Sequence, residues 1–168
     1  MKNLYIDFDG VISDTIEVTY KMLEDLKIDR TDVKAVRNFY RELDWKSLLE
    51  ITPLINNSMD QIQEIITVQK YDVAILTHVN SQAEAIAKIN FIRKYLKETT
   101  IIPVPREVSK TDVVNAKNSI LIDDFTGNLD EWEEKGGIGI RFSKEVRSSK
   151  YINITNLIEI LALDIDKC

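Results

Sequence analysis

Short apolar runs, separated by longer helical patterns, recur along this sequence of 168 residues. They are Leu4–Ile6, Val73–Leu76, Ile101–Val104, Ser119–Ile122 and Ile138–Phe142. Apolar runs of this length, closed by turn residues, predict buried strands. Because parallel neighbours need a long crossover, usually a helix, the alternation favours a parallel sheet. We therefore predict an α/β fold, with a Rossmann-like parallel sheet that carries helices on both faces.

Apolar residues at helical spacing predict the helices between and after these strands. They cover residues 15–26, 31–43, a short stretch from 44, 58–69, 80–96, a short stretch from 110, 129–135 and 156–163. In the helix at 80–96 the apolar positions, which we expect on the buried face, are Ala83, Ile86, Ala87, Phe91 and Leu96. Pro103 cannot donate a hydrogen bond to a neighbouring strand, so the third run is expected at an edge of the sheet.

The first three predicted helices follow one another with no strand between them. Three helices are more than a single right-handed crossover between strands requires. We therefore predict an α/β core formed by residues 1–13 and 58–168, and a small helical cap formed by the insertion 14–57 after the first strand. The alternative is that these helices cover the sheet in the same way as the others.

Composition narrows the class of protein. The apolar fraction of 44% is enough for an ordinary core. The formal net charge of −6 lacks the basic surface expected of a protein that binds a nucleic acid polymer, and no apolar run approaches a membrane span. The single cysteine, Cys168, predicts neither an intrachain disulfide nor a cysteine metal cluster. We expect a cytoplasmic monomer or homodimer that acts on a small molecule.

Polar residues stand directly after three of the apolar runs. Asp7 follows the first run, Thr77 the second, and Asp123 and Asp124 the fourth. Ligands of open parallel sheets bind at the carboxyl ends of the strands, so these side chains are expected to converge on one site. Lys110, at the start of a short helix, is expected to join them.

Asp7 and Asp9 carry the chemistry expected at this site. If the extended backbone continues past the first run, both carboxylates leave the same face of the strand. Neighbouring carboxylates repel each other unless a cation or a shared proton relieves them. Oxygen ligands in a chain with one histidine favour Mg²⁺ over zinc. The alternatives are a solvated acidic turn and a calcium loop; Gly10 comes two positions too early for the calcium loop of an EF-hand.

This set of residues is suited to the transfer of a phosphoryl group. One carboxylate can attack phosphorus as a nucleophile. A second can donate a proton to the leaving oxygen and later accept one from water. Thr77 and Lys110 offer a hydroxyl and an ammonium to the phosphoryl oxygens, and Lys110 also offsets the repulsion between an acidic crevice and a phosphate dianion.

Four motifs, in this order, resemble those of the haloacid dehalogenase-like (HAD) phosphohydrolases. They are Asp7-Phe8-Asp9-Gly10-Val11, Thr77, Lys110 and Asp123-Asp124. The resemblance implies that Asp7 is the nucleophile that forms an aspartyl-phosphate, and that Asp9 is the general acid and base. It further implies a metal site for Mg²⁺ and a phosphoryl site. The metal ligands would be Asp7, the backbone carbonyl of Asp9, Asp123 and Asp124, and the substrate contacts would include Gly10, Thr77 and Lys110.

Within that superfamily the chain most resembles the 5′(3′)-deoxyribonucleotidases and the 5′-nucleotidases of type C. The residues that carry this resemblance are Asp7–Val11, Trp45, Leu121–Asp124, Asn128, Trp132, Gly136-Gly137 and Phe142. In that family, aromatic residues of the cap stack on the base of the nucleotide. Phe39, Tyr40 and Trp45 are candidates here, and the alternative is that they form the core of the cap. His78 stands where the family often has a small residue; we expect its backbone N–H to bind phosphate, with a catalytic role of its ring as the alternative.

The sequence therefore predicts a Mg²⁺-dependent phosphomonoester hydrolase that acts through an aspartyl-phosphate, with nucleoside monophosphates as substrates. One alternative keeps the chemistry and changes the substrate to a sugar phosphate or another small phosphometabolite. The other is a phosphate-binding module without catalytic activity. Arg106, four residues before Lys110, is expected to pair with an acid at the surface, with substrate contact as the alternative.

Overall fold

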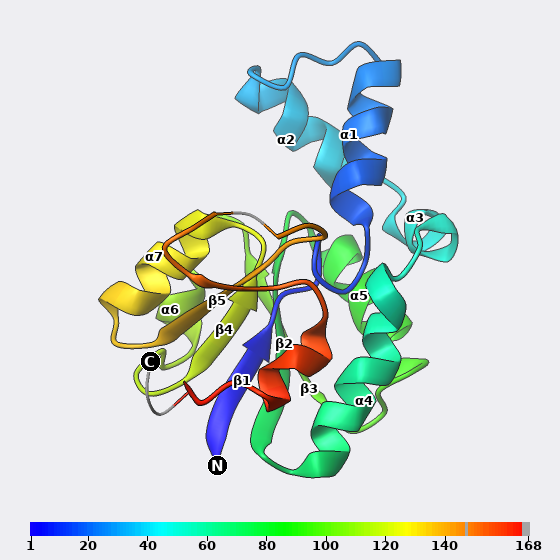
Figure 1. Cartoon of the computed structure of the whole chain (residues 1–168). Coiled ribbons are helices and arrows are strands. Elements are labelled where there is room, and N and C mark those ends of the chain that lie inside the picture. The colour runs from blue at the N-terminus through cyan, green and yellow to red at the C-terminus, as the bar shows by residue number, and fades with distance from the viewer. Residues whose placement is uncertain (147, 166–168) are drawn as a thin grey trace.

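Six parallel strands form one sheet in the computed structural model, which describes residues 1–146 and 148–165 (Figure 1). The strands are β1 (Lys2–Ile6), β2 (Tyr71–Val79), β3 (Thr100–Pro105), β4 (Ile120–Asp123), β5 (Ile138–Phe142) and β6 (Ile152–Ile154). Their order is β3-β2-β1-β4-β5-β6, and every neighbouring pair is parallel. The strand order therefore reverses between β1 and β4. In open α/β sheets such a reversal marks the ligand-binding crevice.

Helices cover both faces of the sheet. The helices are α1 (Thr15–Asp25), α2 (Val33–Glu42), α3 (Trp45–Ile51), α4 (Ser58–Val68), α5 (Gln82–Arg93), α6 (Lys110–Val113) and α7 (Thr126–Glu134), with 3-10 helices at Ile55–Asn57 and Leu157–Leu161. One core lies between the sheet and α4, α5 and the last 3-10 helix. A second, smaller core lies between the sheet and α7. The predicted fold class, a Rossmann-like parallel sheet with helices on both faces, is confirmed.

The central strand β1 is buried on both sides, which explains its apolar sequence. Successive side chains of a strand point to opposite faces. Leu4 and Ile6 pack in the first core with Ile62 of α4. Tyr5 packs in the second core against Trp132 of α7, edge to face, with the ring centroids 5.3 Å apart. Burial of each large apolar side chain contributes roughly 1.5–3 kcal/mol. This packing fixes the position of the strand that leads into Asp7.

The helices α1, α2 and α3 lie beyond the carboxyl end of β1, as Figure 1 shows. The helix α2 buries none of its residues. This placement supports the cap that we predict at 14–57, and we keep that name for the segment; the division of the chain into core and cap stays a prediction. Residues 166–168, including Cys168, lie outside the described residues.

Several boundaries differ from those expected. Thr77 lies within β2 rather than after it, because the strand continues to Val79 and pairs with β3 from Ala74 to Val79. The short strand β6 was not predicted, and the helix expected at 156–163 is a 3-10 helix at Leu157–Leu161. The expectation that Pro103 marks an edge strand is confirmed, since β3 ends the sheet. Among the described residues, no helix is both long and apolar enough to cross a membrane.

Candidate active site

The strand ends bring three of the predicted site residues to one edge of the sheet. Asp7 follows β1 directly, and its backbone N–H donates to the carbonyl of Ile122 in β4 at 2.9 Å. Asp123 is the last residue of β4. Thr77 belongs to β2, on the other side of β1, and is fully buried. The sheet topology therefore places Asp7 between Thr77 and Asp123.

Three carboxylates form an acidic group at this edge. One oxygen each from Asp7, Asp123 and Asp124 lies within 4.8 Å of the others. Asp7 and Asp123 are buried, whereas Asp124 is partly exposed. The ammonium of Lys110, which is 2% exposed, donates to Asp7 Oδ1 at 2.8 Å and to Asp123 Oδ2 at 2.7 Å. The ammonium of Lys110 thus bonds two of the three carboxylates and leaves Asp124 without a bond to it.

The pKa values of this group show that its burial and its crowded negative charges disfavour the ionised carboxylates. Burial raises the pKa of Asp7 to about 7, although Lys110 opposes the increase. Burial, followed by the charges of Asp7 and Asp123, raises the pKa of Asp124 to about 8. Burial would lower the pKa of Lys110, but Asp123 and Asp7 outweigh it and hold the pKa above its usual value. A set of oxygen ligands with excess negative charge fits Mg²⁺, with Asp7, Asp123 and Asp124 as its candidate ligands.

Gly10 makes room for the acidic group. It has a φ of +74°, a conformation that other residues adopt only with strain. A Cβ at this position would also overlap the carboxylate of Asp124. The glycine of the first motif is therefore required by the turn itself, and its predicted contact with substrate stays a prediction.

The side chain of Asp9 is not part of the acidic group and has partners of its own. Its Oδ1 accepts a hydrogen bond from the Thr15 hydroxyl at 2.6 Å, and its Oδ2 accepts one from the Lys88 ammonium at 2.5 Å. The carboxylate is thus held between α1 of the cap and α5 of the core. Asp9 also lines the cleft together with Asp7, so its carboxylate is accessible to a bound substrate. The predicted contact of its backbone carbonyl with Mg²⁺ stays a prediction.

Lys88 is a residue of the site that the sequence analysis missed. Its side chain is 1% exposed, and its ammonium also contacts Glu84 Oε1 at 2.7 Å and the carbonyl of His78 at 3.0 Å. Burial would lower its pKa, but Asp9 and Glu84 raise it above the usual value. The expected buried face of α5 is wrong at two positions, because Ala83 and Ile86 are exposed. The signal that could have found Lys88 is its spacing of four residues from Glu84, which permits an ion pair on one helix face.

The side chains of Thr77 and His78 each form a hydrogen bond to another residue of the core. The hydroxyl of Thr77 accepts a hydrogen bond from Lys88 at 3.3 Å. The ring of His78 is half-buried, and its Nε2 lies 2.9 Å from the carbonyl of Val108. Burial, followed by the charge of Lys110, lowers the pKa of His78, so a neutral ring donates from Nε2 to that carbonyl.

A cleft of about 810 Å³ opens between the cap and this edge of the sheet. Four aromatic side chains line it: Tyr20, Tyr40, Trp45 and Phe125. Trp45 is only 4% exposed, because its ring stacks on Tyr40 with centroids 6.4 Å apart and its indole N–H donates to the carbonyl of Tyr40. Phe39 is not among the lining residues and packs edge to face on Tyr40. Phe125, by contrast, is 57% exposed.

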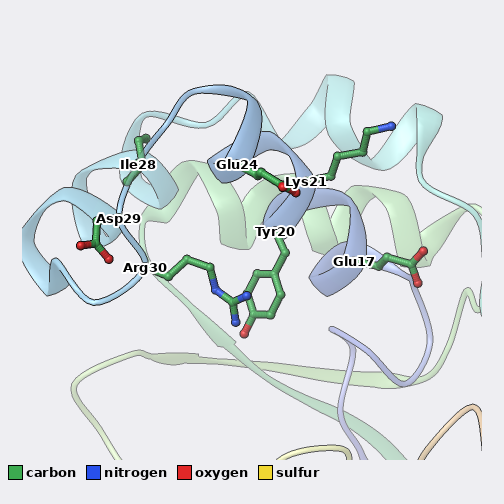
Figure 2. A pocket seen from close by; sticks show the side chains of 7 residues that line it. All are labelled: Glu17, Tyr20, Lys21, Glu24, Ile28, Asp29 and Arg30. Carbon is green, nitrogen blue, oxygen red and sulfur yellow. The ribbon is translucent and has the colours of Figure 1, made fainter.

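A second hollow of about 760 Å³ lies on the cap itself (Figure 2). Its lining residues are Glu17, Tyr20, Lys21, Glu24, Ile28, Asp29 and Arg30. None of the strand-end carboxylates borders it. Figure 2 shows the guanidinium of Arg30 laid over the ring of Tyr20, at 3.8 Å from its centroid. The candidate active site is therefore the cleft at the strand ends and not this hollow.

Comparison with solved structures shows what this architecture resembles. A HAD-superfamily hydrolase of subfamily IA from Geobacter sulfurreducens PCA superposes with a TM-score of 0.60 at 14% identity, covering 96% of this chain and 98% of the other. A haloacid dehalogenase-like hydrolase from Streptococcus pneumoniae gives a TM-score of 0.62 at 15% identity, covering 96% and 97%. The chain has the fold of the HAD hydrolases.

A third structure with this fold is the D,D-heptose 1,7-bisphosphate phosphatase from Burkholderia thailandensis. Its TM-score is 0.56 at 11% identity, and the match covers 96% of this chain and 97% of the other. No protein-family model and no curated protein matches the sequence. The resemblance to nucleotidases in particular therefore depends on the sequence motifs alone.

Proposed function

We propose that the protein is a Mg²⁺-dependent phosphomonoester hydrolase that forms an aspartyl-phosphate on Asp7. The observation that supports this most is the acidic group of Asp7, Asp123 and Asp124. The buried Lys110 bonds Asp7 and Asp123, and Asp7 and Asp124 line the cleft. In this proposal those three carboxylates hold Mg²⁺. A bound Mg²⁺ supplies positive charge that offsets the negative charge of the phosphoryl oxygens.

Asp7 and Asp9 divide the chemical steps between them. A carboxylate oxygen of Asp7 attacks phosphorus, and the bond between phosphorus and the leaving oxygen breaks. That oxygen takes a proton from the carboxyl group of Asp9. Water then attacks the phosphorus, its proton passes to Asp9, and the bond between phosphorus and Asp7 breaks to release phosphate. Lys110 orients Asp7 through its 2.8 Å bond to Oδ1.

Phosphate release from 4-nitrophenyl phosphate, with and without Mg²⁺, tests this mechanism. Asp7→Asn keeps the size of the side chain and removes the nucleophile, so turnover should fall below detection. Asp60→Asn, at an exposed position on α4, is the control and should behave as wild type. Undiminished turnover by Asp7→Asn would exclude the covalent mechanism. Phosphate binding without hydrolysis by the wild-type protein would favour the phosphate-binding module.

Nucleoside monophosphates are the substrates that we propose first. The support is the sequence resemblance together with the aromatic lining of the cleft. Tyr40 and the Lys88 ammonium lie 6.4 and 4.8 Å from the centroid of the Trp45 ring and leave little of that ring accessible to a base. We therefore assign base stacking to the exposed Phe125 rather than to Trp45. Phe125→Ala should raise the KM for nucleotides and leave the KM for ribose 5-phosphate unchanged. A small phosphometabolite remains the second candidate, favoured by the charges described next.

A further inference from the structure

The charged residues that line the cleft are segregated by sign. The acidic ones all come from the core: Asp7, Asp9, Glu84 and Asp124. Among the described residues, the cationic ones are three arginines: Arg30 and Arg37 from the cap, and Arg106 from the segment that follows β3. No acidic residue of the cap is among the described residues that line the cleft. The acidic side chains of the cleft thus come from the strand ends and α5, whereas the guanidinium groups come from the cap and from the segment after β3.

Two of these arginines have no acidic partner among the described residues. Arg41, one turn after Arg37 on α2, pairs with Glu107 at 3.8 Å, and Arg30 lies over Tyr20. Neither Arg37 nor Arg106 forms an ion pair or a side-chain hydrogen bond within residues 1–146 and 148–165. The expectation that Arg106 pairs with a surface acid is therefore wrong for this part of the chain.

Arg37 and Arg106 meet the cleft near the same cap residue, Tyr40. Arg37 and Tyr40 are three residues apart on α2, so they share a face of that helix. The backbone N–H of Arg106 donates to the carbonyl of Val79 at 3.0 Å, which fixes the start of this segment at the end of β2. The charge of Arg106 also acts on the phenol of Tyr40 and on the ring of His78. Arg106 therefore lies where the cap faces the strand ends.

Guanidinium groups that line a cleft without an acidic partner can bind an anionic ligand. A guanidinium binds carboxylate and phosphate through paired hydrogen bonds, and does so better than an ammonium. In the proposed function the phosphoryl group that reacts lies beside Asp7 and Lys110, and these arginines form no part of that contact. Resting on the proposed phosphatase function, we infer that the leaving group of the substrate carries a second anionic group, a carboxylate or a second phosphate, which Arg37 and Arg106 bind. Within that function, the second anion favours a small phosphometabolite over a nucleoside monophosphate, whose leaving group is uncharged.

Pairs of phosphoesters that differ by one anionic group test this inference. Suitable pairs are glycerol 3-phosphate with 3-phosphoglycerate, fructose 6-phosphate with fructose 1,6-bisphosphate, and AMP with adenosine 3′,5′-bisphosphate. In at least one pair the wild-type kcat/KM should favour the compound with the second anion by roughly tenfold or more, the value of one charged hydrogen bond. Arg37→Gln and Arg106→Gln should each remove most of that preference through KM.

The matched control is Arg41→Gln, on the same helix but outside the cleft lining. It should leave both members of every pair unchanged. Equal losses for both members in Arg37→Gln and Arg106→Gln would show general electrostatic attraction and overturn the inference, as would the absence of any preference in wild type. Arg37 and Arg106 are exposed, so their variants should melt at the wild-type temperature.

A binding measurement separates this inference from the proposed function. Calorimetry with Asp7→Asn protein and the preferred dianionic compound needs no turnover. If the wild-type protein hydrolyses no phosphoester, binding to Asp7→Asn that is weakened tenfold by Arg37→Gln still supports the anion site. If hydrolysis is observed but the arginine substitutions change neither binding nor KM, the proposed function stands and the anion site is refuted.

Discussion

Replacement of Lys88 by methionine is expected to lower the free energy of unfolding by about 3–5 kcal/mol. The side chain is 1% exposed, and its ammonium lies 2.5 Å from Asp9 and 2.7 Å from Glu84. Methionine keeps much of the apolar stem, so the loss comes mainly from the charge. Glu84, itself 1% exposed, would be left buried without a cation. Removal of one partner of a buried pair costs this much because the remaining charge stays desolvated.

Urea denaturation followed by tryptophan fluorescence measures this loss. In thermal melts the same loss should lower Tm by roughly 6–20 °C, since about 1 kcal/mol corresponds to roughly 2–4 °C in a chain of this size. Lys150→Met is the matched control, because Lys150 pairs with Asp130 at 2.7 Å but is 64% exposed. That substitution should cost less than about 1 kcal/mol.

The pH dependence separates lost charge from lost packing. Burial raises the pKa of Glu84, and removal of Lys88 should raise it further. A carboxyl group whose pKa is higher in the folded state destabilises the protein as the pH rises, because the unfolded state gives up its proton first. The defect of Lys88→Met should therefore shrink toward low pH, and Glu84→Gln should recover part of it. A loss below about 1 kcal/mol with no pH dependence would refute the reasoning.

Three further predictions concern the acidic group. Lys110→Met should abolish phosphate release, because it removes the ammonium that bonds two of the three carboxylates. Gly10→Ala should lower the free energy of unfolding by roughly 1–2 kcal/mol, because φ is +74°. The added Cβ would overlap the carboxylate of Asp124 and should weaken Mg²⁺ binding. Thermal melts with and without Mg²⁺ test both effects. In EDTA, stability should fall as the pH rises from about 4 to about 7–8 and then level off, because Asp7 and Asp124 keep their protons in the folded protein up to pKa values of about 7 and about 8, while the unfolded carboxyls ionise near 3.8. Urea denaturation at several pH values measures this trend, which Mg²⁺ should reverse.

The sequence predicted most of the sheet because strands buried on both faces have continuous apolar sequences. This pattern located five of the six strands. The sixth, Ile152–Ile154, has only three residues, with Asn153 in the middle, and so gives no apolar run. The last helix was predicted with the wrong geometry, because the 3-10 helix Leu157–Leu161 has the same apolar residues that suggest an α-helix. Short elements of this kind are determined by the surfaces against which they pack.

The strand-end residues of the site were predictable because topology alone brings them together. Asp7, Thr77 and Asp123 converge in any parallel sheet in which β2, β1 and β4 are neighbours. Lys88 was not predictable from periodicity, which assigns a lysine to the solvent. Its burial depends on Asp9, a carboxylate 79 residues earlier in the chain. Glu84 and Lys88 are buried on α5, whereas Ile86 of the same helix is 52% exposed.

Five carboxylates and two lysines meet around the carboxyl end of β1, and the way they pair has a consequence for binding. The carboxylates are Asp7, Asp9, Glu84, Asp123 and Asp124. Lys110 bonds two of them and Lys88 another two, so Asp124 has no ammonium partner among the described residues. A phosphate dianion that approaches this edge alone meets excess negative charge, whereas a divalent cation is attracted. Phosphate should therefore bind weakly in EDTA and tightly with Mg²⁺. Equal affinity in both conditions, measured by calorimetry, would mean that the arginines of the cleft alone bind it.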